Sequence, residues 1–149
     1  MKKALLITII LLVLAGCNTA QAPVAQAQQE IGYCDRDAVE VSLDEYSRVV
    51  DRWNDMDLLG GVTQRMNLPM VLSDMIKLKW EAQEIVHPEC MDKTEEELMK
   101  HMATSLESYR LFLTENEDES LQKSQLADTY MQAYIREKNR ILECAPDCE

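Results

Sequence analysis

The sequence predicts an all-α fold for the chain after residue 33, an antiparallel up-and-down four-helix bundle stapled by disulfides at one pole. Three observations predict it. Gly and Pro number only four each in 149 residues, and residues of high helix propensity dominate. From about residue 42 onward, apolar residues recur at spacings of three and four, which is the period of an amphipathic helix. The connections between these segments are short, so consecutive helices are expected to run antiparallel.

The first two helices are predicted to be separated by a break before Pro69. The first begins at about Ser42, a suitable N-cap, and loosens at Gly60-Gly61, while residues 62–67 either continue it or form a turn. The second helix holds Pro69 in its first turn, where proline is tolerated, and ends at His87-Pro88. The predicted core-facing residues are Leu43, Tyr46, Val50 and Trp53 in the first helix, and Leu68, Val71, Leu72, Met75, Leu78, Ala82 and Ile85 in the second.

The third helix is predicted to begin at Thr94, whose hydroxyl group and the Glu97 side chain would form a capping box. The polar residues 115–118 then lead to a fourth helix that begins near Glu119 and ends at Cys144-Ala145-Pro146. The predicted apolar stripes are Leu98, Met102, Leu106, Tyr109 and Leu113 in the third helix, and Leu121, Ala127, Met131, Tyr134 and Ile141 in the fourth.

The N-terminus has the form of an export signal. Residues 1–3 (MKK) are positively charged, and the apolar run that follows reaches only Ala15, whereas a membrane-spanning helix needs about 20 apolar residues. The boundary Leu14-Ala15-Gly16-Cys17 resembles the bacterial lipobox at all four positions: an aliphatic residue, two small residues and a cysteine. The resemblance covers this targeting segment alone. It implies cleavage before Cys17 and attachment of diacylglycerol to the Cys17 thiol.

Three segments follow from this boundary. Residues 1–16 are the predicted lipoprotein signal peptide, residues 17–33 the lipidated N-terminus with a flexible tether rich in Ala, Gln and Pro, and residues 34–149 the helical bundle domain. An aspartate directly after the lipidated cysteine resembles a retention signal for the inner membrane, and this chain has Asn18 at that position instead. We therefore expect an exported protein, anchored by lipid to the outer membrane if the organism has one, and otherwise to the outer face of the cytoplasmic membrane.

The charge balance argues against a nucleic-acid partner. Removal of residues 1–16 takes away two of the 15 basic residues, which leaves 13 against 27 acidic ones and a net charge of −14. Phosphate recognition needs a basic surface, and anionic lipid headgroups would repel this domain. Membrane attachment is therefore assigned to the N-terminal acyl chains alone.

The four cysteines that remain after lipidation of Cys17 are an even set in an oxidising compartment, which favours two disulfides. In the predicted bundle, Cys34, Cys90, Cys144 and Cys148 all lie at one pole. The predicted pairing links Cys90 to one C-terminal cysteine and Cys34 to the other, with both choices open. The alternative is a local Cys144–Cys148 bond that leaves Cys34 paired with Cys90.

No motif indicates an enzyme or a bound cofactor. A nucleophile elbow and a phosphate-binding glycine loop are both missing from the sequence. The spacing of Glu84 and His87 gives half of the carboxylate-histidine set of di-iron bundles, and in this acidic chain it is better interpreted as an exposed helix end. The weak candidates for a Cu or Zn site are His87, Met99, His101 and Met102, which spacing alone does not bring together as a full ligand set.

Two classes of function are compatible with these features. The first is a membrane-anchored structural or protein-interaction module, whose bundle surface binds another protein of the cell envelope. The second is an envelope lipoprotein that binds a small ligand or a Cu or Zn ion, which requires a pocket between the helices.

Overall fold

The computed structural model of the chain describes residues 33–145 and 147. By its backbone contacts the chain divides into two units, Met1–Glu30 and Ile31–Glu149, and the described residues belong to the second. The predicted signal peptide, Cys17, the tether up to residue 32, and Cys148 lie outside the described residues.

The described residues form four α-helices and no strand, so the predicted all-α class is confirmed. Two 3₁₀ turns, η1 and η2, precede the second and third of these helices. None of the four helices is apolar enough over a sufficient length to cross a membrane. The elements are α2 (Arg36–Val62), η1 (Arg65–Asn67), α3 (Leu68–Gln83), η2 (Glu89–Met91), α4 (Asp92–Leu113) and α5 (Glu117–Cys144).

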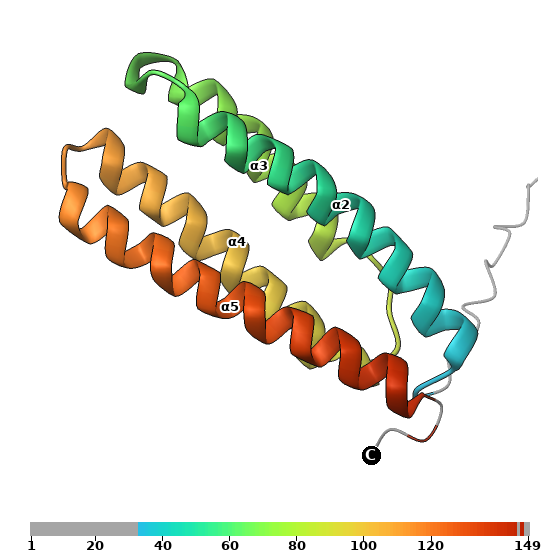
Figure 1. The fold of residues 1–149 in the computed structure, drawn as a ribbon. Coiled ribbons are helices and arrows are strands. Elements are labelled where there is room, and N and C mark those ends of the chain that lie inside the picture. The colour runs from blue at the N-terminus through green and yellow to red at the C-terminus, as the bar shows by residue number, and fades with distance from the viewer. Residues whose placement is uncertain (1–32, 146, 148–149) are drawn as a thin grey trace, which may run out of the picture. The chain divides into compact units, whose positions relative to one another are not determined.

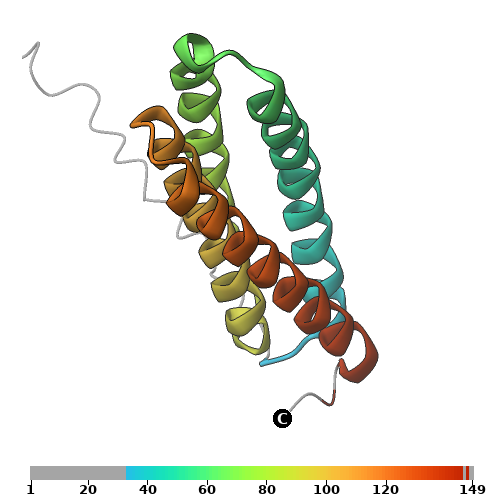
Figure 2. The ribbon, with the colours of Figure 1, turned by 60° about the vertical axis from the view of Figure 1, so that its left-hand side comes forward.

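The helices lie side by side in two pairs, α2 with α3 and α4 with α5 (Figure 1). The connections 63–67 and 114–116 lie at one end of the domain, which we call the turn end. The start of α2, the connection 84–91 and the end of α5 lie at the opposite end, which we call the cysteine end (Figure 2).

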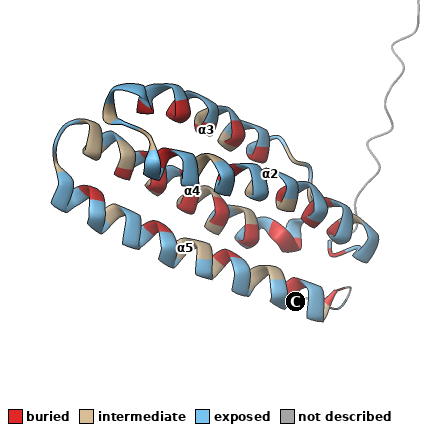
Figure 3. Ribbon diagram, turned by 45° about the horizontal axis from the view of Figure 1, so that its top comes forward, coloured by how far each residue is buried: buried red, intermediate tan, exposed pale blue. Residues whose placement is uncertain are grey.

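The core lies where the apolar faces of the helices meet (Figure 3). Of the predicted stripes, Val50, Ile85, Tyr109, Leu113 and Met131 are only partly buried, and the prediction fails at Leu121, which is 61% exposed. The buried residues of α5 are instead seven apart, so Ser120 rather than Leu121 continues the stripe. The predicted residues that are buried are Leu43, Tyr46, Trp53, Leu68, Val71, Leu72, Met75, Leu78, Ala82, Leu98, Met102, Leu106, Ala127, Tyr134 and Ile141.

The predicted start of the first helix at Ser42 is wrong, because α2 begins at Arg36. The side chain of Asp35 caps it, with Oδ1 accepting a hydrogen bond of 2.9 Å from the Ala38 N–H. Ser42 lies inside the helix and is buried. Its hydroxyl donates to the carbonyl oxygens of Ala38 at 2.8 Å and Val86 at 3.1 Å, so it binds the connection 84–91. The helix also continues through Gly60 and Gly61 to Val62.

The predicted break before Pro69 is confirmed. The chain turns through residues 63–67, and α3 begins at Leu68 with Pro69 in its first turn. The helix ends at Gln83, four residues earlier than the predicted stop at His87-Pro88. Residues 85–88 leave the helix because the Val86 carbonyl oxygen accepts from Ser42 of α2, and because Pro88 disfavours helical backbone at His87.

The predicted capping box at Thr94 is also wrong. The turn η2 leads into α4 at Asp92, which places Thr94 inside the helix and fully buried, with no hydrogen-bond partner for its hydroxyl group. Glu97 forms an ion pair of 3.0 Å with Lys100 instead of turning back to the helix start.

The helices α4 and α5 approach each other closely through side chains that reach the opposite backbone. The Ser108 hydroxyl donates to the Ser120 carbonyl oxygen at 2.8 Å, and the Ser120 hydroxyl donates to the Ser108 carbonyl oxygen at 2.9 Å. Further along, Nδ1 of His101 donates to the Ala127 carbonyl oxygen at 2.9 Å. Only small residues at the contact permit such close backbones, and Ser105, Ser108, Ser120 and Ala127 are all buried there.

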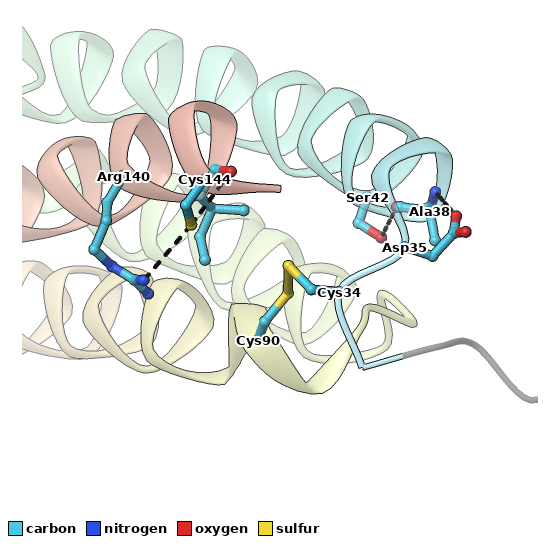
Figure 4. The surroundings of a disulfide bond; sticks show 8 residues. Cys34, Asp35, Ala38, Ser42, Cys90, Arg140 and Cys144 are labelled. Atoms are coloured by element: carbon cyan, nitrogen blue, oxygen red, sulfur yellow. Dashed lines mark hydrogen bonds between the residues drawn. A yellow bond between two sulfur atoms is a disulfide. The ribbon is translucent and has the colours of Figure 1, made fainter. Parts of the chain in front are cut away.

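The predicted disulfide pairing is wrong: Cys34 is bonded to Cys90, with their Cα atoms 5.4 Å apart (Figure 4). The peptide N–H of Cys90 also donates to the Tyr33 carbonyl oxygen at 3.1 Å, so the two segments meet through backbone as well. Cys144 lies at the same end with Nη1 of Arg140 3.9 Å from its Sγ atom. Cys144 is disulfide-bonded too, and since Cys34 and Cys90 pair with each other, its partner lies outside the described residues.

We predict that removal of the Cys34–Cys90 bond destabilises the domain more than removal of any bond at Cys144. The cysteines are separated by 56 positions, for which the chain-entropy model gives about 4 kcal/mol. The double variant Cys34→Ala/Cys90→Ala should lose this free energy of unfolding in urea titrations. The matched variant Cys144→Ala/Cys148→Ala should lose less, because these positions are close in the sequence and a bond between them would close only a short loop. Non-reducing peptide maps with Cys90 linked to a C-terminal peptide would contradict the assignment.

Candidate functional site

A cleft of about 430 Å³ lies at the turn end, between the last turns of α2 and the helices α4 and α5. Its lining includes three carboxylates, four serines and two aromatic rings, and no lysine or arginine. The residues that line it are Asp57, Gly60, Gly61, Thr63, His101, Ser105, Ser108, Tyr109, Phe112, Glu117, Ser120, Leu121, Ser124, Ala127 and Asp128.

Tyr109 connects α4 to the end of α2 at one wall of the cleft. Its hydroxyl donates to the Asp57 carbonyl oxygen at 2.8 Å and lies 3.0 Å from Oδ1 of the same residue. A Cβ atom at Gly60 would stand 2.9 Å from the Tyr109 ring, so only glycine lets the ring pass beneath α2. Burial, and then the neighbouring Asp57 carboxylate, raise the pKa of Tyr109 above its ordinary value. The hydroxyl therefore stays protonated and holds Asp57 in place.

His101 forms part of the lining from α4 and is 6% exposed. Because a carbonyl oxygen can only accept, the contact to Ala127 places a proton on Nδ1. In the neutral ring Nε2 is then an acceptor, and this buried atom has no hydrogen-bond partner. The ring also meets Trp53 of the core edge-on, with centroids 6.0 Å apart. His101 thus joins the cleft to the core and retains an unused acceptor.

Arg65 joins the two connections of the turn end. From η1 its guanidinium lies 4.5 Å above the centre of the Phe112 ring, and it forms ion pairs with Glu115 at 3.3 Å and Glu117 at 3.0 Å. Of the three carboxylates in the cleft, Glu117 is therefore neutralised. Asp57 and Asp128 have no cationic partner among the residues that the structure describes.

A second hollow, of about 630 Å³, lies between α2 and α3 and has a different electrostatic character. Its lining mixes four acidic residues with Arg48 and Arg52, and Arg52 forms an ion pair with Glu81 across the two helices. Glu45, Asp51 and Glu84 of this lining have no cationic partner among the described residues, so this hollow is also acidic. The cleft at the turn end differs from it in that no lysine or arginine lines it.

His87 is not an exposed helix end, as the sequence had suggested. It lies in the connection 84–91, with Nδ1 3.1 Å from the Tyr46 hydroxyl and Nε2 3.3 Å from Oδ1 of Asp92. Glu95 of α4 lies 3.7 Å from Nε2. Burial raises the pKa of Tyr46 above its ordinary value, so its hydroxyl stays available to this network. The imidazole fixes the path of the connection between α3 and α4.

The four weak metal candidates are not brought together. His87 is held in the connection 84–91, His101 is bonded to α5, Met102 is fully buried and Met99 is partly buried. Among the described residues, no three His, Cys, Asp or Glu side chains are grouped so that they could hold a metal ion.

Sequence reasoning found His101 but missed the cleft around it. Asp57, Tyr109 and Asp128 come from three different helices, and no local motif links them. One signal was present, namely the seven-residue spacing of Ser120, Ala127, Tyr134 and Ile141, which places Ser120 and Ala127 on the inner face of α5.

Comparisons with protein-family models, with curated proteins and with solved structures give no match to this chain. The interpretation of the site therefore depends on its own geometry.

Tyr109 and Tyr134 supply a matched test of this geometry, because the buried Tyr134 hydroxyl has no hydrogen-bond partner. Tyr109→Phe should lower the free energy of unfolding by about 1–2 kcal/mol, since it removes the bond to Asp57. Tyr134→Phe should leave it unchanged or raise it by up to about 1 kcal/mol at pH 7. Urea titrations of the two variants measure both effects, and equal losses would contradict the assignment.

The same pair has a pH signature. Burial raises the pKa of Tyr134 from 10.0 to about 12, so the folded chain keeps a proton that the unfolded chain releases. The resulting stability is fully present below pH 10 and is lost as the pH rises towards 12. Tyr134→Phe should therefore lose less stability than the unmodified chain between these two pH values.

Proposed function

We propose that this chain is an exported lipoprotein of the cell envelope whose helical domain is a protein-interaction module. The observation that carries the proposal is the Cys34–Cys90 disulfide, because such bonds persist in oxidising compartments outside the cytosol. It supports export independently of the signal-like N-terminus and of the lipobox resemblance at Leu14-Ala15-Gly16-Cys17. Lipid on Cys17 anchors the chain to the outer membrane if one is present, and otherwise to the outer face of the cytoplasmic membrane.

In this proposal the domain is an antiparallel up-and-down bundle with its tether at the cysteine end. Cys34 is joined to the connection 84–91 there, so a pull on the tether is transmitted to two segments of the domain instead of to α2 alone. The turn end lies opposite the cysteine end, where the described residues begin with Tyr33 and Cys34. It is therefore the end most accessible to another envelope protein.

The turn end has the surface that an interaction module needs. Leu58, Val62, Met66 and Met70 are between 68% and 80% exposed, and we call these four residues the apolar tip. Between Asp57 and Asp74 the chain has no acidic residue, although the whole chain has 27. Exposed apolar surface of this kind marks sites of protein contact. The partner surface is expected to be apolar, since the four residues of the tip have no charge and the neighbouring Arg65 is paired with Glu115 and Glu117.

The anchor is tested by Cys17→Ala. In cells fed an alkyne fatty acid, the unmodified chain should incorporate the label and fractionate with membranes, whereas Cys17→Ala should remain an unlabelled precursor. Cys144→Ala/Cys148→Ala serves as a control that removes cysteines elsewhere and keeps Cys17. Label that persists in Cys17→Ala would contradict lipidation at this position.

The interaction surface is tested by photocrosslinking in the native envelope. A photoreactive residue at Met66 should give a discrete adduct with a second protein, and the same residue at Val41, which is exposed on α2 nearer the cysteine end, should not. Val62→Glu/Met70→Glu should abolish the Met66 adduct without changing the melting temperature. Equal adducts from Met66 and Val41, or none from Met66, would contradict the proposal.

The second candidate function is binding of a ligand at the envelope. The cleft between α2, α4 and α5 favours it, because its volume falls within the range of about 300–1,000 Å³ that is typical of small-molecule sites. A Cu or Zn ion is not supported as the ligand by any cluster of His, Cys, Asp or Glu among the described residues.

A further inference from the structure

The geometry points to the cleft at the turn end as a binding site for a small organic amine, an ammonium ion with N–H donors and an apolar body. The inference rests on the second candidate function, ligand binding. It goes further because it assigns the chemical class of the ligand from the groups that line the cleft.

The charge of the cleft selects a cation. Asp57 and Asp128 line it without a cationic partner among the described residues, while Glu117 is already paired with Arg65 at 3.0 Å. The half-buried Asp57 keeps one carboxylate oxygen available, since the Tyr109 hydroxyl contacts only Oδ1. A carboxylate in a partly enclosed site attracts a cation more strongly than one in open water.

The end of α2 adds to the same potential. Gly60, Gly61 and Thr63 bring the C-terminal turn of this helix to the cleft, and that turn contains no basic residue. The C-terminus of a helix bears about half a negative charge from its unpaired carbonyl groups, and a cation near it is stabilised.

The hydrogen-bonding groups select N–H donors. Asp57 and Asp128 can only accept, and behind them the buried Nε2 of His101 is a further acceptor without a partner, because Nδ1 donates to Ala127. Ser124 is exposed and lines the cleft with a hydroxyl that can also accept. A primary ammonium supplies donors to such a set, whereas a quaternary ammonium supplies charge alone.

The walls select an apolar body. Tyr109 and Phe112 of α4 and Leu121 of α5 line the cleft, and Leu121 is 61% exposed. The Tyr109 ring passes beneath Gly60, where any larger residue would collide with it. A ligand with one ring or a short alkyl chain fits a volume of about 430 Å³.

The test is calorimetric titration of the purified full-length protein in a maltoside detergent, with phenethylamine as the probe. Its neutral analogue 2-phenylethanol and the quaternary phenethyltrimethylammonium ion are matched controls. Phenethylamine should bind at one site, and both analogues should bind at least about tenfold more weakly, since each lacks one of the two selected properties.

Variants locate the binding. Asp57→Asn/Asp128→Asn should weaken the binding of phenethylamine by at least about tenfold. The amide oxygen introduced at position 57 can still accept a hydrogen bond from Tyr109, so this wall of the cleft is kept. Asp118→Asn/Glu119→Gln removes the same two charges outside the cleft lining on α5 and should have no effect. Gly61→Phe should block the cleft without unfolding the domain, because a Cβ atom there has nothing within 4 Å.

The outcomes separate the amine from other ligands. Equal binding of phenethylamine and 2-phenylethanol would overturn the amine class and leave ligand binding in place. No binding of phenethylamine, or binding that Asp57→Asn/Asp128→Asn leaves unchanged, would overturn the amine site. If Nα-acetyl-lysine methylamide binds about tenfold more tightly than phenethylamine, the proposal of a free amine as the ligand is overturned in favour of a lysine side chain of a partner protein. Mass spectrometry of molecules released from the natively purified protein tests ligand binding separately.

Discussion

Ser108 and Ser120 hold α4 and α5 so close that each hydroxyl reaches the carbonyl oxygen of the other helix, and the rest of the described structure depends on that approach. Because these residues are small, the two backbones come together there, and His101 can reach the Ala127 carbonyl oxygen from α4. The end of α2 does not close over this pair in the same way. It is held by Tyr109 at Asp57, which leaves the cleft open between a rigid helix pair and a helix end.

The helices could be predicted from the sequence because their apolar spacing is a local property. Tyr46, Trp53 and Met75 are buried as expected, and the break before Pro69 is where the proline requires it. The helix starts could not be predicted as well, because Ser42 and Thr94 have the residue type of an N-cap and yet lie inside their helices. For Ser42 the reason is tertiary, since its hydroxyl donates to the Val86 carbonyl oxygen 44 positions away.

The candidate site was less accessible to such reasoning. Its carboxylates belong to different helices. A carboxylate can attract a ligand only if no cation of the protein already neutralises it, and the ion pair of Arg65 with Glu117 is a tertiary contact that the sequence does not reveal. His101 was named only as a weak candidate for a metal ligand by residue type, and its Nδ1 is used by the backbone of α5. The disulfide pairing failed for a related reason. All the cysteines were expected at one end, and at that end the contact of Tyr33 with Cys90 brings Cys34 to Cys90.

The methionines of the domain differ sharply in their access to oxidants. Met75, Met91 and Met102 are fully buried, whereas Met66 and Met70 of the apolar tip project into solvent. A compartment that maintains the Cys34–Cys90 bond also exposes thioethers to peroxide and hypochlorite, which convert methionine into a polar sulfoxide. Oxidative stress would therefore make the surface of the tip more polar long before it loosened the core. The fold would survive such damage intact, and the loss would fall on the partner contact that we propose for the tip.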